Sequence, residues 1–138
     1  MAYLAAALGG ALGALARWAV GEWLPHRPGQ WPWSTLVVNL VGCAAIGLLL
    51  AVLLARYAGH PWLRPFLAVG VLGGFTTYST FAVDAVALAD AGRPMEAAGY
   101  VLLSVVGGVL AVVAGLLAGR AAVGRAAPSP TAGTDRSR

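Results

Sequence analysis

Four long apolar runs constrain this chain more than any other feature of its sequence. They cover about residues 2–23, 34–55, 64–84 and 97–119, and a helix needs roughly 20 mainly apolar residues to cross the hydrocarbon core of a membrane. The composition agrees, because 59% hydrophobic and 10% charged residues leave too little polar surface for a water-soluble fold. We therefore predict an all-α integral membrane protein with four transmembrane helices.

Turn-forming segments separate the runs. The connection after the first run is rich in proline and glycine, and residues 59–61 and 92–94 break the chain before the third and fourth runs. Residues 1–120 are predicted to form one transmembrane domain, and residues 121–138 a disordered polar tail. Aromatic residues lie near the ends of the runs, as expected of an interfacial belt; they include Trp23, Trp31, Trp33, Tyr57 and Trp62.

The third run is interrupted near its middle by Gly73-Gly74-Phe75-Thr76-Thr77. Non-helical backbone at membrane depth is tolerated only where it is buried in protein or lines a wet cavity, since each unpaired amide or carbonyl costs several kcal/mol in lipid. A break would free carbonyls able to coordinate a cation. The glycines could instead allow close helix packing, because residues 9–13, 70–74 and 115–119 show the same small-residue spacing. The sequence leaves both interpretations open.

Polar side chains also occur within the other apolar runs. Asn39 lies in mid-run, and an amide there either joins helices or donates hydrogen bonds to an anion. Tyr78 and Phe81 are three residues apart and share a helix face, either as core packing or with ring edges, the positive end of the aromatic quadrupole, turned to an anion. Tyr100 and Ser104 place two hydroxyl donors on one face of the fourth run.

The remaining polar residues give no sign of an enzyme. His26 and His60 fall in loops, where we expect them to be solvated, and no cluster of His, Cys, Asp and Glu has the spacing of a metal site. Asp84 is expected to reach the membrane interface. Arg17 lies within the first run, where it could anchor the helix at the interface or line a pore mouth. Basic residues are scattered, so nucleic-acid binding is not indicated.

Three segments together resemble the Fluc (CrcB) fluoride channels. They are GGALGALARW at residues 9–18, STLVVNLVG at residues 34–42 and GVLGGFTTYSTF at residues 70–81, in a four-span chain matching over residues 1 to about 120. The resemblance implies a fluoride-specific channel of the cell membrane that passively exports fluoride and lowers its cytoplasmic concentration. It also implies an antiparallel, dual-topology dimer with two pores and a structural, untransported Na⁺ at its centre.

The resemblance also implies roles for individual residues. The backbone carbonyls of Gly73 and Thr76 would hold the Na⁺, and Arg17 matches the arginine of the family's first span, at a pore mouth or vestibule. Tyr78 stands where the family usually has Phe, which adds a hydroxyl to the ring edge. The positions that match the family's pore lining are Asn39, Tyr78, Phe81, Tyr100 and Ser104.

Topology and rival functions follow from the charged residues. Near the span ends the arginines divide four against two or three, which places both termini inside by a small margin and is compatible with insertion in both orientations. The partner is therefore a second copy or a paralogous subunit. A small multidrug-resistance-type transporter also has four spans, but it needs a mid-span carboxylate, and Glu22 lies near the end of the first run. A subunit that only packs through its glycines would not explain Asn39.

Overall fold

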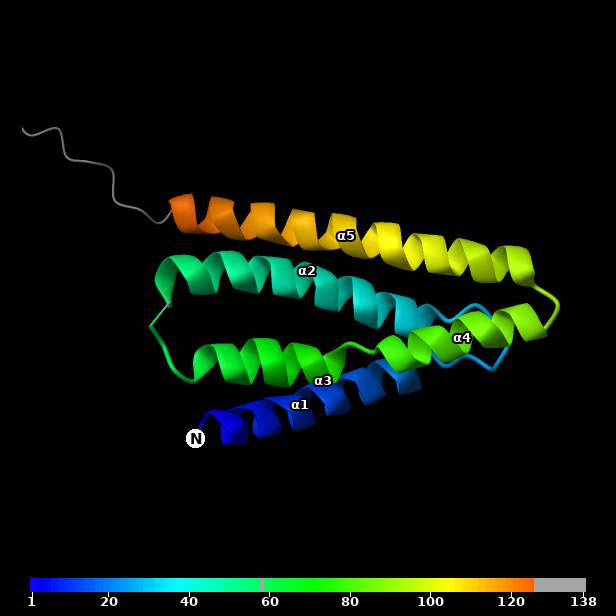
Figure 1. Ribbon diagram of the computed structural model, residues 1–138, viewed down its shortest axis with the longest axis horizontal. Helices are drawn as coiled ribbons and strands as arrows, with labels where there is room; N and C mark the ends of the chain where they lie inside the picture. The colour runs from blue at the N-terminus through cyan, green and yellow to red at the C-terminus, as the bar shows by residue number, and fades with distance from the viewer. Residues whose placement is uncertain (58, 126–138) are drawn as a thin grey trace, which may run out of the picture.

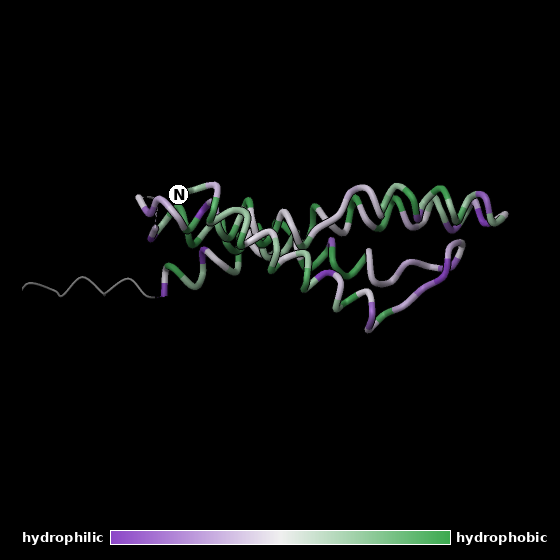
Figure 2. The backbone as a smooth tube through the Cα atoms, turned by 90° about the horizontal axis from the view of Figure 1, so that it is seen from below, coloured by the Kyte–Doolittle hydropathy of each residue, from purple (hydrophilic) through white to green (hydrophobic). Residues whose placement is uncertain are grey.

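The computed structural model describes residues 1–57 and 59–125, which form an all-helical bundle (Figure 1). Four helical segments in this part of the chain are long and apolar enough to span a membrane, and they run over Ala2–Trp23, Trp33–Arg56, Pro65–Asp90 and Pro94–Arg125. Apolar residues make up most of each helix in Figure 2. The prediction of four membrane-spanning helices is confirmed.

The first two spans are continuous helices, α1 (Ala2–Trp23) and α2 (Trp33–Arg56). The proline-rich loop between them contains Gly29, whose φ of 80° lies in the left-handed region that glycine adopts without steric cost. The last span, α5 (Pro94–Arg125), begins with proline at a position where no helical N–H is lost. It continues to Arg125, five residues beyond the predicted domain boundary at residue 120, and the division into a domain and a tail stays a prediction. The rest of the predicted tail lies outside the described residues.

The third span is not one regular helix. It consists of a π-helical segment η1 (Pro65–Leu72), a short turn α3 (Gly73–Phe75) and the helix α4 (Tyr78–Asp90). Thr76 and Thr77 have extended backbones, with ψ angles of 157° and 121°. The predicted interruption is therefore present but narrower than residues 73–77, because Gly73 and Gly74 are still helical. A π-helical turn before the break was not predicted.

The helices pack in two closely fitted pairs, α1 with η1 and α3, and α2 with α5. A Cβ at Gly13 would collide with the carbonyl oxygen of Val71, and a Cβ at Gly115 would collide with that of Ala44, so these glycines let the helix backbones touch. The packing interpretation of the small-residue spacings thus holds beside the interruption. The N-terminus, the α2–η1 connection and the end of α5 lie at one end of the bundle (Figure 1).

A small apolar core lies towards the other end, around the α1–α2 loop and the α4–α5 turn. Its fully buried members are Leu88 and Tyr100, and Trp31, Leu40 and Phe81 pack against it. Many large apolar side chains elsewhere are exposed in the single chain, as expected of a surface that meets lipid or another subunit. This core places α4 and α5 side by side just beyond the break.

Candidate functional site

The break at Thr76 and Thr77 is held open by one side chain of α2. The Asn39 Nδ2 donates to the Thr77 carbonyl at 2.9 Å, and the Thr77 N–H donates to the Asn39 Oδ1 at 2.9 Å. This pair of bonds supplies, in mid-span, the partners that the extended backbone of Thr77 cannot find within its own helix. Asn39 therefore has the structural role of a helix-joining amide, and its second N–H stays available as a donor.

The two carbonyls predicted to hold Na⁺ both lack their usual helical donors. In a continuous helix the N–H groups of Thr77 and Thr80 would donate to the carbonyls of Gly73 and Thr76, four residues earlier. The Thr77 N–H instead donates to Asn39, and the Thr80 N–H donates to the Thr77 Oγ1 at 3.2 Å, capping α4. The break thus removes the helical donors of both residues named from the sequence, and the Thr76 oxygen accepts from Arg17 instead.

A bare carbonyl oxygen suits a hard cation, so the freed oxygens of Gly73 and Thr76 fit Na⁺ by type. Two carbonyl oxygens are too few to hold Na⁺, however, because a hard cation takes several oxygen ligands and one chain offers only these two. The Arg17 Nη1 also donates to the Thr76 carbonyl, at 3.3 Å. The Na⁺ site stays a prediction, and it requires further ligands from outside this chain.

Arg17 turns inward from α1 and is half-buried, while its predicted role, as an interfacial anchor or at a pore mouth, stays a prediction. Its side chain borders a cavity of about 440 Å³ that we call the polar pocket. The lining comes from α1, the α1–α2 loop, α2 and the start of α4, and consists of Ala14, Arg17, Trp18, Gly21, His26, Ser34, Thr35, Val38, Thr77, Ser79 and Thr80. Hydroxyl groups and a guanidinium thus gather beside the N-terminus of α4, where the helix dipole favours an anion.

A second cavity, of about 300 Å³, also borders the break, and we call it the aromatic pocket. Thr77 borders both pockets. Of the five predicted pore residues, four line the aromatic pocket, and the fifth, Tyr100, packs against Phe81 with ring centroids 5.3 Å apart. The full lining is Asn39, Cys43, Thr76, Thr77, Tyr78, Phe81, Ser104 and Val105. The structure therefore brings the predicted pore residues together, although their role in conduction stays a prediction.

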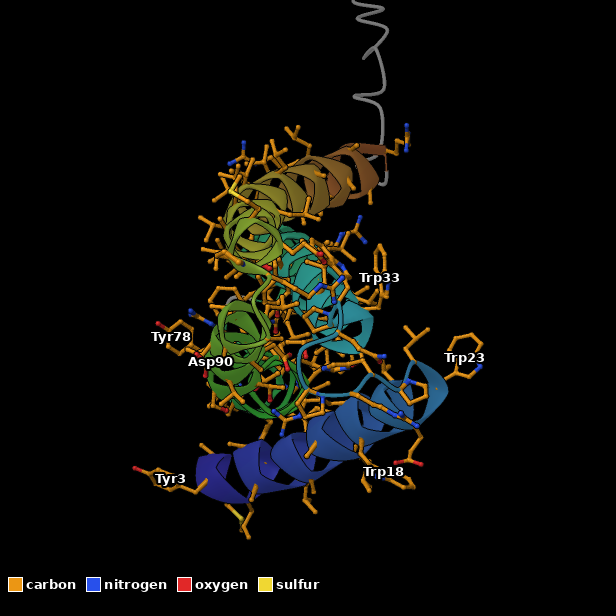
Figure 3. All side chains as sticks on the ribbon, turned by 90° about the vertical axis from the view of Figure 1, so that its right-hand side faces the viewer. Tyr3, Trp18, Trp23, Trp33, Tyr78 and Asp90 are labelled. Carbon is orange, nitrogen blue, oxygen red and sulfur yellow. The ribbon has the colours of Figure 1, made fainter. Side chains whose placement is uncertain are left out.

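Tyr78 and Phe81 share a face as expected, with ring centroids 5.9 Å apart. Their surroundings differ. Phe81 packs against the core, whereas Tyr78 is 81% exposed and its ring points away from the bundle in Figure 3. An exposed aromatic ring at membrane depth faces lipid or another subunit, so the Tyr78 hydroxyl lies outside the helices of this chain.

Two hydroxyl groups of α5 are buried without a partner among the described residues. They are the Tyr100 Oη and the Ser104 Oγ, and Tyr100 is 0% exposed. The indole N–H of Trp31 is unpaired in the same part of the structure, and its ring meets Tyr100 edge to face at 5.9 Å. An unpaired buried donor costs about 1–3 kcal/mol, so a group of three indicates a place for an acceptor. The sequence analysis missed the indole N–H, because Trp31 looked like one more interfacial aromatic.

The expectation that His26 is solvated is wrong, and its contact with Asp84 was not predicted. His26 is not simply solvated, since its Nε2 lies 3.2 Å from the Asp84 Oδ1 and its Nδ1 lies 3.1 Å from the Ser34 Oγ. The other oxygen of Asp84 accepts from the Thr35 Oγ1 at 2.6 Å, and the position of Asp84 at the membrane interface stays a prediction. The side chains of His26 and Asp84 are only 18% and 11% exposed. Residues 58 positions apart meet here, and no local pattern marks such a pair.

Comparison with known proteins shows the family that the chain resembles. Residues 4–116 match the family described as CrcB-like protein, Camphor Resistance (CrcB). The chain is 46% identical over 89% of its length to the fluoride-specific ion channel FluC 2 of Nocardia farcinica, covering 88% of that protein. It is 45% identical over 85% of its length to the fluoride-specific ion channel FluC of Chloroflexus aurantiacus, covering 94% of it. It is also 46% identical over 86% of its length to the fluoride-specific ion channel FluC of Bordetella petrii, covering 91% of that protein.

Proposed function

The chain belongs to the CrcB family, and we propose on this premise that it forms a fluoride-specific ion channel in the cell membrane. The residue-level support comes from the aromatic pocket and the helix behind it. There the hydroxyls of Tyr100 and Ser104 are buried without an acceptor among the described residues. An anion in this position would accept from both.

Fluoride is small and strongly hydrated, so a pore that admits it must replace much of its hydration shell with oriented donors. Asn39, which keeps one N–H without a partner in the part of the chain described, and Ser104 both line the aromatic pocket. The ring of Phe81 borders the same pocket, packs against Tyr100 and can present its positive edge. These groups are neutral, so they bind an anion weakly enough to release it.

The proposed path joins the two pockets. Arg17 and the hydroxyls of the polar pocket attract the anion from one side of the membrane, and Thr77 borders both cavities. Beyond Thr77 the anion would meet Phe81 and the donors of α5. We infer that movement is passive and follows the electrochemical gradient, so that fluoride leaves the cell when its cytoplasmic concentration rises.

We further propose that the working unit is an antiparallel dimer with a structural Na⁺ at its centre. Support comes from the freed carbonyls of Gly73 and Thr76, which supply too few ligands within one chain, and from the exposed ring of Tyr78. A cation there would act as a fixed charge between the broken helices and would not be transported. The second subunit is either another copy or a paralogue in the opposite orientation.

The rival proposal of a small multidrug-resistance-type transporter gains no support. Glu22 is exposed near the end of α1, rather than buried in mid-span, where a proton relay would need it.

Fluoride efflux from liposomes tests the proposed function. Purified protein is reconstituted into vesicles loaded with potassium fluoride, a potassium ionophore is added, and released fluoride is followed with a fluoride electrode. We expect rapid efflux that scales with protein content and is missing from protein-free vesicles. Equal release from both preparations would contradict the proposal.

A further inference from the structure

His26 borders the polar pocket and belongs to a hydrogen-bonded chain of four side chains. The chain runs from Thr35 to Asp84, then to His26 and on to Ser34, with distances of 2.6, 3.2 and 3.1 Å. Three elements contribute to it: α2, α4 and the α1–α2 loop. All of its members except Asp84 line the pocket.

The geometry decides which ring nitrogen of His26 carries the hydrogen when the ring is neutral. An ionised carboxylate only accepts hydrogen bonds, so the nitrogen that faces Asp84, Nε2, must be the donor. The Nδ1 is then an acceptor, and the hydroxyl group of Ser34 donates its hydrogen to this nitrogen. When a proton binds at Nδ1, this nitrogen becomes a donor to the Ser34 Oγ, and the hydroxyl hydrogen of Ser34 is released.

Protonation also changes the charge beside the pocket. The charged groups that face His26 are Asp84 from α4 and Arg17 across the pocket from α1, whereas α2 contributes the neutral Ser34 and Thr35. Its charged neighbours in sequence, Arg27 and Glu22, are exposed and do not line the pocket. With neutral His26, the pair with Asp84 carries one negative charge, which opposes anion entry. With protonated His26 the pair is neutral, and the positive charge of Arg17 acts alone.

We propose that His26 is an acid-responsive residue of the anion entrance, whose protonation neutralises Asp84, frees the Ser34 hydroxyl to face the pocket and so speeds fluoride entry. The inference rests on the proposed fluoride channel function. Histidine is the side chain whose ordinary charge change falls between about pH 5 and 8. Channel conductance would then rise as the medium becomes acidic.

The test compares the initial rate of fluoride efflux from liposomes at about pH 7.5 and at about pH 5.5, towards the two ends of the range in which histidine changes charge. In each experiment the pH is the same inside and outside the liposomes. Protein-free vesicles are measured at each pH and subtracted, because hydrogen fluoride crosses lipid unaided. We expect wild-type efflux to be about threefold faster at the lower pH, the size of effect expected from one screened charge near a solvated pocket. The increase should shrink at high ionic strength.

Three variants separate the contributions. His26→Gln cannot take up the proton and should show a ratio near one, whereas His60→Gln, which changes the exposed histidine of the α2–η1 loop, should keep the threefold ratio. Ser34→Ala should show a reduced ratio, and an undiminished ratio would overturn the role of its hydroxyl. Equal ratios in wild type and His26→Gln, or a wild-type ratio of one with clear efflux, would overturn the inference alone. Failure of wild type to conduct at either pH would overturn the proposed function itself.

Discussion

Asn39 shows how a single polar residue can serve both the fold and the proposed path. Both of its hydrogen bonds go to the backbone of Thr77, so it fills the gap in the third span, and the same residue borders the aromatic pocket with one N–H left without a partner in the described part of the chain. Tyr100 and Ser104 differ, since their hydroxyls serve no bond among the described residues. A hydrogen-bond donor with an acceptor inside the chain therefore has a structural role, whereas a buried donor without one is free to bind an anion.

Replacement of Asn39 by Asp should slow fluoride efflux by at least about tenfold. The carboxylate would lose the N–H bond to the Thr77 carbonyl and would place a negative charge in the path of an anion, each at a cost of 1 kcal/mol or more. The control is Val37→Ala, two residues earlier and on the opposite face of α2, which should conduct like wild type. Efflux through both variants is measured with the fluoride electrode, after gel filtration has shown that each elutes at the same volume as the wild-type protein. Normal efflux through Asn39→Asp would rule out this residue as a pore donor.

At the scale of helices, α1 is positioned by contact of its backbone with η1 and α3. Gly13 of α1 faces the Val71 carbonyl and the Phe75 amide, and Gly74 of α3 faces the backbone of Gly10. This approach brings Arg17, one turn further along α1, to the Thr76 carbonyl. The small residues thus set where the guanidinium lies.

Gly13→Ala should therefore destabilise the protein, whereas Gly10→Ala should not. A Cβ at Gly13 would collide with the Val71 carbonyl oxygen, and overpacking of this kind typically costs about 1–3 kcal/mol. A Cβ at Gly10 has no neighbour within 4 Å, and alanine favours the helix. Thermal unfolding in detergent, followed by loss of the gel-filtration peak, should show a lower midpoint for Gly13→Ala only. Equal midpoints would contradict the packing described for α1.

The sequence predicted some of these elements better than others, and the reason is physical. Spans such as Ala2–Trp23 follow from local hydropathy and length, which are properties of the segment alone. The exact place of the break depends on Asn39, 38 residues away, and the His26–Asp84 pair joins residues 58 apart. Four of the five residues that the resemblance named as pore lining border one pocket, because a family resemblance carries information about long-range contacts, and their role in conduction stays a prediction.

At the scale of the whole molecule, one chain supplies every group of the proposed path but leaves two requirements open. The carbonyls at the break need more ligands for a cation, and a broad apolar surface, with Tyr78 on it, needs a cover. A second subunit in the opposite orientation would meet both needs. The pore residues are neutral, so selection for fluoride must arise from hydrogen bonding rather than from net charge.

Selectivity between two halide ions is therefore the most direct test of the account. A single channel in a planar bilayer, with potassium fluoride on one side and an equal concentration of potassium chloride on the other, gives a reversal potential that reports the permeability ratio. A tenfold preference for fluoride would shift the reversal potential from zero by about 59 mV. We expect a much larger shift, of the sign that a preference for fluoride produces. A reversal potential near zero would mean that chloride passes as readily as fluoride, and would contradict the proposed function.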